Sequence, residues 1–213
     1  MDLSLNELSG WNLAGQNLTN AKFSNPWGGH AATLTNTDLS LADLRASIGA
    51  SLSAAITRNT ILPGGEIAAL HLVAGDVLAV RDYDGNVPIT VLSAMTMAPT
   101  STLEIALLDP TWGSTISFAP GIPVTLAGDL RLSLAPGSDP ATLIGHTFQL
   151  FDWTGVSPTG QFNILSDPAF IWDTTKLYST GQVTLVVPEP TPAGLLLLIP
   201  LSLLRRPRRP ERS

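Results

Sequence analysis

Leucine recurs at every fifth position near the start of the chain, and this period limits the folds that are open to it. The series includes one phenylalanine and consists of Leu3, Leu8, Leu13, Leu18, Phe23, Leu34, Leu39 and Leu44. Asn or Asp often precedes the apolar residue, as in Asn12-Leu13 and Asp43-Leu44. A period of five rotates around an α-helix and keeps no single face, so the pattern disfavours a leucine-rich helix. It indicates a repeat protein, whose units must stack to be stable.

This pattern resembles the pentapeptide-repeat family, whose consensus is Ala-(Asp/Asn)-Leu-x-x. The resemblance implies a short right-handed quadrilateral β-helix over residues 1–60, with one pentapeptide on each side and the leucine or phenylalanine directed inward. In that family the residue two places earlier is small and also directed inward, and here Ala21, Ala32 and Ala42 fit that position. The repeats make about two coils, which are too few to be stable alone, so we expect the following segment to cap them.

Residues 61–187 have the pattern of short strands separated by turns. Alternating apolar residues predict two of the strands, at Leu103, Ile105 and Leu107 and at Leu130, Leu132 and Leu134. Turn signals occur at Pro63-Gly64-Gly65, Asp84-Gly85 and Pro136-Gly137, of which the last two fit hairpins. Strands that recur at intervals of roughly 8–12 residues predict an all-β fold, either a β-solenoid that continues the first stack or a β-sandwich.

The C-terminal segment, residues 188–213, consists of a short polar motif that begins one residue earlier, an apolar run and a basic stop. The motif consists of Val187, Pro188, Glu189 and Pro190. The basic stop consists of Arg205, Arg206, Arg208 and Arg209. As a hydrophobic helix, the run between them reaches roughly 18 Å, short of the ~30 Å hydrocarbon core of a bilayer. We therefore expect a weak permanent anchor that enters the membrane interface, with its arginines at the anionic cytoplasmic face.

The order of these three parts resembles the PEP-CTERM sorting signal of exported bacterial proteins. The resemblance implies that an exosortase, a membrane protease-transpeptidase, recognises the tail and cuts near the Pro-Glu-Pro motif. It also implies a location in the cell envelope, first at the membrane and then at the cell surface or outside the cell. Residues 1–7 have neither the basic nor the apolar region of a signal peptide. We therefore expect the export signal to lie upstream of Met1.

Aromatic residues gather between positions 148 and 181, just before the tail. They are Phe148, Phe151, Trp153, Phe162, Phe170, Trp172 and Tyr178. The segment resembles the closing block of autotransporter-like β-repeat passengers in PEP-CTERM proteins, especially planctomycete ones. The resemblance implies that Trp153, Trp172 and Tyr178 close the open end of the β-stack and cover its edge strand. An aromatic platform that stacks on carbohydrate is the alternative interpretation.

Motifs for catalysis or metal binding are weak. The chain has no cysteine, which excludes disulfides and thiolate metal sites. His30, His71 and His146 lie far apart in the sequence, and none has the local pattern of a metal ligand or a Ser-His-Asp triad. Residues 82–86 begin like a calcium loop but lack its later glycine and glutamate. We therefore predict no enzyme, no cofactor and no metal site.

Paired carboxylates are the remaining candidates for hydrolysis. The aspartates considered are Asp109, Asp129, Asp152 and Asp173, and all four lie next to turn signals. Aspartate is common in turns, so the pattern favours a structural role for them.

Charge is distributed unevenly along the chain. Five arginines and one glutamate give the segment from Arg205 onward a charge of +4. Because the whole chain has a net charge of −6, the residues before Arg205 carry −10. An acidic body disfavours nucleic-acid binding. We predict a structural or adhesive protein of the cell surface or extracellular matrix, with exopolysaccharide as a partner that the resemblance implies. The alternatives are a carbohydrate-binding or carbohydrate-active β-solenoid protein and, from the pentapeptide resemblance, a DNA-mimicking topoisomerase inhibitor.

Overall fold

The computed structural model describes residues 33–45, 52–81 and 87–186, and before them the single positions Leu3, Leu13, Gln16, Leu18, Ala21 and Phe23. Within these residues, the regular structure consists of short strands and two four-residue helices. In chain order the elements are β1 (Glu66–Ile67), β2 (Leu70–Leu72), β3 (Val77–Arg81), β4 (Ile89–Val91), β5 (Met95–Met97), β6 (Thr102–Leu107), β7 (Ile116–Phe118), β8 (Val124–Leu126), β9 (Asp129–Leu134), α1 (Pro140–Leu143), β10 (Thr147–Gln149), β11 (Thr159–Gly160), β12 (Asn163–Ser166), β13 (Ile171–Asp173), α2 (Leu177–Thr180) and β14 (Gln182–Val186). The prediction of an all-β fold is confirmed.

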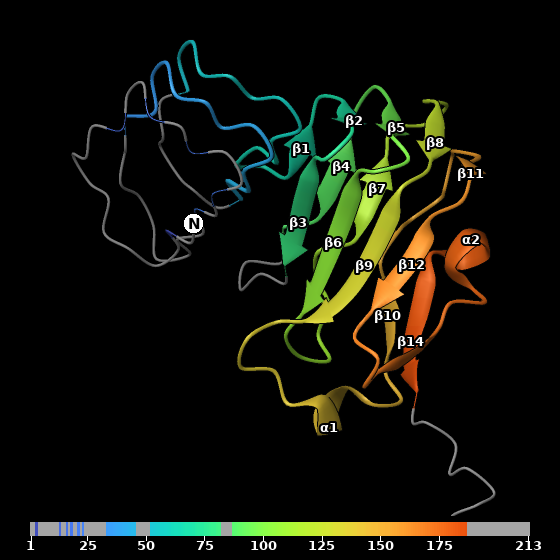
Figure 1. Cartoon of the computed structure of the whole chain (residues 1–213). Helices are drawn as coiled ribbons and strands as arrows, with labels where there is room; N and C mark the ends of the chain where they lie inside the picture. Colours follow the sequence, from blue (N-terminus) through green and yellow to red (C-terminus); the bar gives the residue numbers. More distant parts are fainter. Residues whose placement is uncertain are drawn as a thin grey trace, which may run out of the picture.

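Three parallel sheets run through the body, and nearly every strand in them pairs with the strand three places further along the chain (Figure 1). Their strand orders are β1-β4-β7, β2-β5-β8-β11 and β3-β6-β9-β12. The chain therefore visits the same three sheets in four successive passes, which we call circuits 1 to 4 (residues 66–81, 89–107, 116–134 and 151–166). In circuit 4, Phe151 takes the place of a strand by bridging in parallel to Ile116 of β7.

Side chains in these strands alternate between the interior and the outside, as a half-buried sheet requires. In β2, Leu70 and Leu72 are buried while His71 between them is exposed. Strand register places the buried residues of successive circuits directly over one another, for example Leu78, Leu103 and Leu130. Full burial of each such leucine stabilises the fold by about 1.5–3 kcal/mol. The parallel sheets thus share one apolar core.

The expected hairpin at Pro136-Gly137 is wrong. β9, which precedes it, pairs in parallel with β6 and β12, and the chain then continues through α1 to β10. Parallel neighbours cannot be joined by a two-residue turn, so the turn residues only end the strand here. The parallel sheets also do not fit the sandwich alternative, whose sheets are antiparallel. The second expected hairpin, at Asp84-Gly85, lies outside the described residues.

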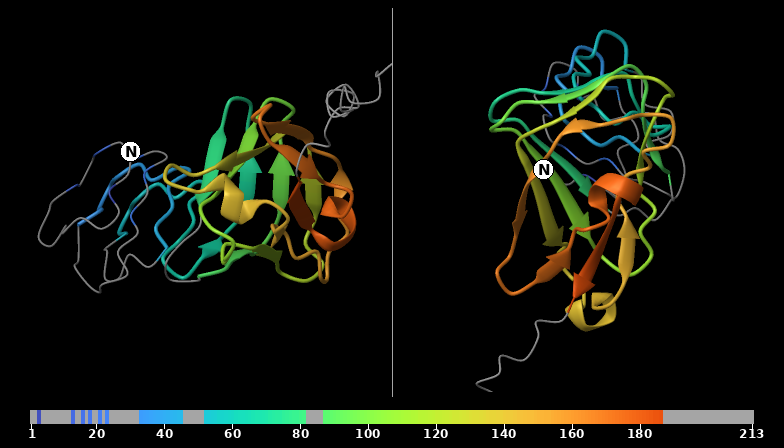
Figure 2. Two further views of the ribbon diagram at one scale, coloured as in Figure 1. Left: turned by 90° about the horizontal axis from the view of Figure 1, so that it is seen from below. Right: turned by 90° about the vertical axis from the view of Figure 1, so that its right-hand side faces the viewer.

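One antiparallel sheet, β10-β14-β13, lies at the end of the body away from the N-terminal repeats (Figures 1 and 2). Its middle strand, β14, follows α2 and pairs with β10 on one side and β13 on the other. α2 ends at Gly181, whose φ of 77° is the left-handed conformation common after helices. Antiparallel strands at this end stop the parallel series from continuing.

The N-terminal repeats form ladders with a period of five residues. The amides of Leu18 and Phe23 donate to the carbonyls of Asp38 and Asp43, at 2.8 and 2.9 Å. We call each row of repeat positions in these ladders a rank. A further rank follows, because the amide of Leu39 donates to the carbonyl of Ile56 at 2.8 Å. The non-glycine residues with positive φ are spaced by five within each rank and comprise Asn36, Leu41, Ala54 and Asn59. All four lie in turns, at the same five-residue spacing as the leucines.

The repeat leucines have a common interior. The buried members of this cluster are Leu18, Ala21, Phe23, Leu34, Leu39, Ala42 and Leu44, with Leu3 and Leu13 packed at its margin. Leu8 and Ala32 lie outside the described residues. Thr37 takes an inward position as well, and its buried hydroxyl donates to the carbonyl of Leu34 at 2.6 Å. Gln16, two places before Leu18, is exposed.

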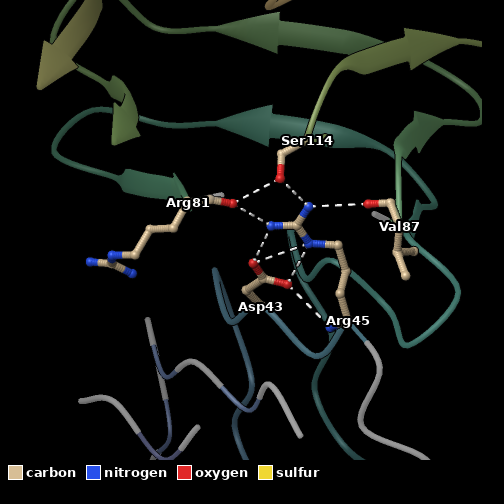
Figure 3. Close-up of polar contacts among 5 residues, drawn as sticks. All are labelled: Asp43, Arg45, Arg81, Val87 and Ser114. Atoms are coloured by element: carbon tan, nitrogen blue, oxygen red, sulfur yellow. Dashed lines mark hydrogen bonds and ion pairs between the residues drawn. The ribbon is translucent and has the colours of Figure 1, made fainter. Parts of the chain in front are cut away.

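A buried ion pair joins the repeats to the body (Figure 3). The guanidinium of Arg45 is fully buried and bonds to both carboxylate oxygens of Asp43, its Nη2 lying 2.8 Å from Oδ2. Its other N–H groups donate to the carbonyls of Arg81 (2.9 Å) and Val87 (3.2 Å) and to the hydroxyl of Ser114 (2.7 Å). The Arg45 side chain therefore satisfies backbone carbonyls of the body, at the end of β3 and just before β4.

Asn59 makes a second joint between the repeats and the body. Its side-chain amide donates to the carbonyl of His71 at 2.8 Å and accepts from the His71 amide at 2.6 Å. The side chain thus replaces a neighbouring strand at the free edge of β2. Nearby, Arg58 forms a more exposed ion pair with Asp76, and that hydrogen bond lowers the pKa of the Asp76 carboxyl.

Gly181 is expected to tolerate alanine much less well than Gly145. Both glycines have φ near +80°, but a Cβ at Gly181 would clash with the carbonyl oxygen of Phe151, whereas no atom lies within 4 Å of a Cβ at Gly145. Gly145→Ala therefore costs about 1–2 kcal/mol for left-handed strain alone, while Gly181→Ala also displaces α2. Urea unfolding of the two variants measures the difference, and equal losses of stability would contradict the close approach.

Candidate functional site

A hollow of about 610 Å³ lies beside circuit 4 and α2, within the size range of small-ligand sites, roughly 300–1,000 Å³. Three parts of the chain line it: the residue before β7, the segment from the end of β10 to circuit 4, and α2. The lining residues are Thr115, Gln149, Asp152, Trp153, Thr154, Ser179 and Thr180. All of them except Trp153 are polar, and the only charged one is an aspartate.

Backbone pairing brings the first two parts together. The amide of Ile116 donates to the carbonyl of Leu150, and the amide of Asp152 donates back to the carbonyl of Ile116, both at 2.9 Å. The Thr115 hydroxyl adds a bond to the carbonyl of Gln149 at 2.7 Å. This bridge places the side chains of circuit 4 next to the start of β7.

The side chain of Gln149 connects α2 to the segment from β10 to circuit 4 that lines the hollow. Its side-chain Nε2 donates to the carbonyls of Phe151 and Thr180. These two bonds use both protons of the amide group, so the Oε1 atom of Gln149 is left to accept. The end of α2, with Ser179 and Thr180, is thereby held against the hollow.

Asp152 supplies the charge of the site. Its carboxylate accepts a bond from the Thr154 amide at 3.0 Å. The Thr154 hydroxyl, and then this amide, hold the pKa of Asp152 below its usual value. The carboxylate is consequently ionised at neutral pH and acts only as an acceptor. The same Asp-x-Thr arrangement recurs at Asp173, whose pKa the Thr175 amide and hydroxyl lower, but that aspartate does not line the hollow.

Trp153 lines the hollow, but its ring is packed against other aromatic rings. The residue is only 9% exposed, and its Nε1 donates to the carbonyl of Leu177 at 2.8 Å. One ring face stacks on Phe118 (5.2 Å between centroids) and the ring also stacks on Phe151 (4.6 Å). This packing is that of a residue closing the core, and it does not favour a carbohydrate-stacking platform at Trp153.

The other two residues of the expected closing block also pack inward. Tyr178 stacks near Phe162 (6.4 Å), and its hydroxyl accepts a bond from the Phe162 amide at 3.0 Å. Trp172 meets Phe148 edge to face at 6.2 Å. Its Nε1 is buried without a hydrogen-bond partner among the described residues.

A line of oxygen-bearing side chains crosses the sheet and ends at the hollow. Register places Glu66, Thr90 and Ser117 on successive strands, and Asp152 follows because its neighbour Phe151 pairs with Ile116. The hydroxyls of Thr90 and Ser117 lie 3.0 Å apart. Neighbouring strands lie about 4.8 Å apart. We call these four side chains the oxygen ladder; its two ends are exposed and its two hydroxyls are half-buried.

The candidate carboxylates bond to nearby turns or to a neighbouring strand. Asp109, like Asp152 and Asp173, accepts from the amide two residues later, at 2.6 Å, and Asp129 accepts from Asn163 at 2.7 Å. In the described part of the chain, no group of three or more His, Asp or Glu residues could hold a metal ion. His71 contacts the Thr96 hydroxyl at 2.5 Å, while His30 lies outside the described residues.

The sorting tail also lies outside the described residues. This applies to Val187, Pro188, Glu189, Pro190, Arg205, Arg206, Arg208 and Arg209, and to the expected hydrophobic helix between them. In the ranges that the structure covers, no helix has the length and apolarity needed to cross a bilayer. The chain matches no family model, and neither a curated protein nor a solved structure is significantly similar to it.

Proposed function

We propose that this chain is a structural or adhesive protein of the cell surface or extracellular matrix, exported and then sorted by its C-terminal tail. The observation that carries the proposal is the shared core of the four circuits, with repeats joined at one end and an aromatic-rich sheet at the other. A stack of this kind gives a rigid body with long outward faces, which suits a scaffold outside the cell.

In architectural terms, we propose a short right-handed quadrilateral β-helix of pentapeptide repeats, stacked on a three-sided β-solenoid. The five-residue spacing of the turns supports the first part, and the return of the chain to the same three sheets supports the second. The proposed closing block is residues 148–181, whose aromatic side chains fill the last circuit.

We propose that the C-terminal tail is the sorting signal, and that an exosortase and the membrane are its partners. The order of motif, apolar run and arginines supports this assignment. The run is short for a stable span, which suits a segment that is held only until it is cut.

Carbohydrate binding is the second candidate function, favoured by the polar hollow and the oxygen ladder. A glycoside hydrolase would further need two carboxyl groups about 5–9.5 Å apart across the substrate. The hollow contributes Asp152 alone, so the proposal is for binding and includes no catalytic step.

Cell fractionation tests the sorting proposal. The full chain and a variant lacking residues 188–213 are expressed with a secretion signal in a bacterium that has an exosortase. A matched control keeps the composition of the tail but places the arginines before the apolar run. We expect the full chain in the envelope and the other two outside it. Identical fractionation of the full and shortened chains refutes the proposal.

A further inference from the structure

We propose that the hollow beside circuit 4 binds a unit of an uncharged polysaccharide, and that the oxygen ladder holds the neighbouring part of the same polymer. The inference rests on the adhesive role proposed above and gives it a ligand class. It uses two independent observations, namely the lining of the hollow and the register that leads the ladder to Asp152.

The hydrogen-bonding groups of the hollow match a ligand rich in hydroxyls. The Asp152 carboxylate and the Gln149 Oε1 are acceptors. The hydroxyls of Thr154 and Ser179 donate to Asp152 and to the Lys176 carbonyl, so their oxygens are left to accept from a ligand. A sugar hydroxyl both donates and accepts, so each of these groups finds a partner on a pyranose ring. A bond from such a hydroxyl to the charged carboxylate is among the stronger kinds.

Charge selects against acidic ligands. The lining of the hollow includes no lysine or arginine, and both ends of the ladder, Glu66 and Asp152, are carboxylates. A uronic acid or a phosphate placed here would meet like charge without a counter-ion. Apolar ligands are also disfavoured, because six of the seven lining residues are polar and the ring of Trp153 is stacked on Phe118 and Phe151.

The shape of the site predicts weak binding of each unit and tighter binding of a long polymer. The hollow is open to solvent, and Trp153 is too tightly packed to provide a stacking face for the sugar. The ladder adds further contacts along a line of three strand positions and Asp152. Several weak contacts on one chain raise the overall affinity, because each binding event raises the effective concentration for the next.

Affinity electrophoresis of the full chain in gels that contain a polysaccharide tests this inference. The neutral probes are dextran, mannan and galactan, and the acidic probe is polygalacturonate. Asp152→Asn removes the charge and retains an aspartate-like turn. Asp173→Asn is the matched control, because it changes the same Asp-x-Thr arrangement away from the hollow. Ser179→Trp fills the hollow from exposed α2.

We expect at least one neutral probe to retard the protein and polygalacturonate to have no effect. Asp152→Asn should weaken the retardation about tenfold, the size of one hydrogen bond to a charged group, and Ser179→Trp should abolish it. Asp173→Asn should bind within about twofold of the natural chain, since surface changes away from a site have small effects. Retardation by none of the neutral probes, preference for polygalacturonate, or equal losses in the two aspartate variants overturns the inference.

Fractionation of the Asp152→Asn variant separates this inference from the proposed function. If the variant reaches the envelope as the natural chain does while no neutral polysaccharide is bound, the ligand assignment fails and the sorting proposal stands. If a neutral polysaccharide is bound but sorting does not depend on the tail, the sorting proposal fails and the ligand assignment stands.

Discussion

Replacing Leu39 with aspartate is expected to unfold the N-terminal repeats. Leu39 is fully buried in the repeat cluster, and its amide bonds to the carbonyl of Ile56 in the next rank. Loss of the leucine side chain alone costs about 2–5 kcal/mol. A buried, unpaired carboxylate adds several kcal/mol more. The sum is comparable to the whole stability of a typical domain, about 5–15 kcal/mol.

Circular dichroism during heating and amide hydrogen exchange measure this effect. Exchange protection should be lost first in residues 33–45, which contain the substituted rank. Leu92→Asp is the control, because Leu92 is 46% exposed and a charge there remains hydrated. An unchanged melting temperature and unchanged protection in Leu39→Asp would contradict the inward position of the repeat leucines.

Replacing Arg45 with methionine is expected to destabilise the joint between repeats and body by about 3–5 kcal/mol. The reason is that Asp43 would remain buried without its counter-ion, and the carbonyls of Arg81 and Val87 would lose a donor. The double variant Asp43→Leu/Arg45→Met should recover part of the loss, since it removes the unpaired charge. It should not recover all of it, because the Val87 carbonyl still lacks the Arg45 donor and the Arg81 carbonyl keeps only the bond from the Ser114 hydroxyl.

Urea unfolding of the single and double variants gives the coupling between the two residues. Arg58→Met is the matched control. Its partner Asp76 is also an aspartate of the joint, but the Arg58 side chain is 46% exposed, and an exposed pair contributes only about 0–1 kcal/mol. A loss in Arg45→Met no greater than that in Arg58→Met would show that the buried pair does not hold the joint together.

The sequence predicted the class of structure well and the strand pairing poorly. Alternation at Leu103, Ile105 and Leu107 predicted β6, because successive side chains of a strand point to opposite faces. Thr102 and Ala106 on its other face are buried as well. Its partners β3 and β9 start 25 and 27 residues away, with no local signal that relates them. The turn at Pro136-Gly137 was mistaken for a hairpin for the same reason, since turn residues report where a strand ends and not what it pairs with.

The candidate site was predicted only in part. Asp152 and Trp153 stood out as a turn aspartate and a large aromatic residue. Thr115, Gln149 and Thr180 did not, because common polar residues carry no signal until the parallel bridge brings positions about 35 residues apart together. Arg45 was missed similarly, since its burial follows from how the repeats meet the body.

The claim that the body works outside the cell is tested most directly by labelling lysines on intact cells that make the protein naturally. Lys176 lies beside α2 and is exposed to solvent, so a membrane-impermeant amine reagent can reach it. We expect Lys176 to be labelled on intact cells to the same extent as after lysis. Labelling of Lys176 only after lysis, while a known surface protein of the same cells is labelled before it, would contradict the account.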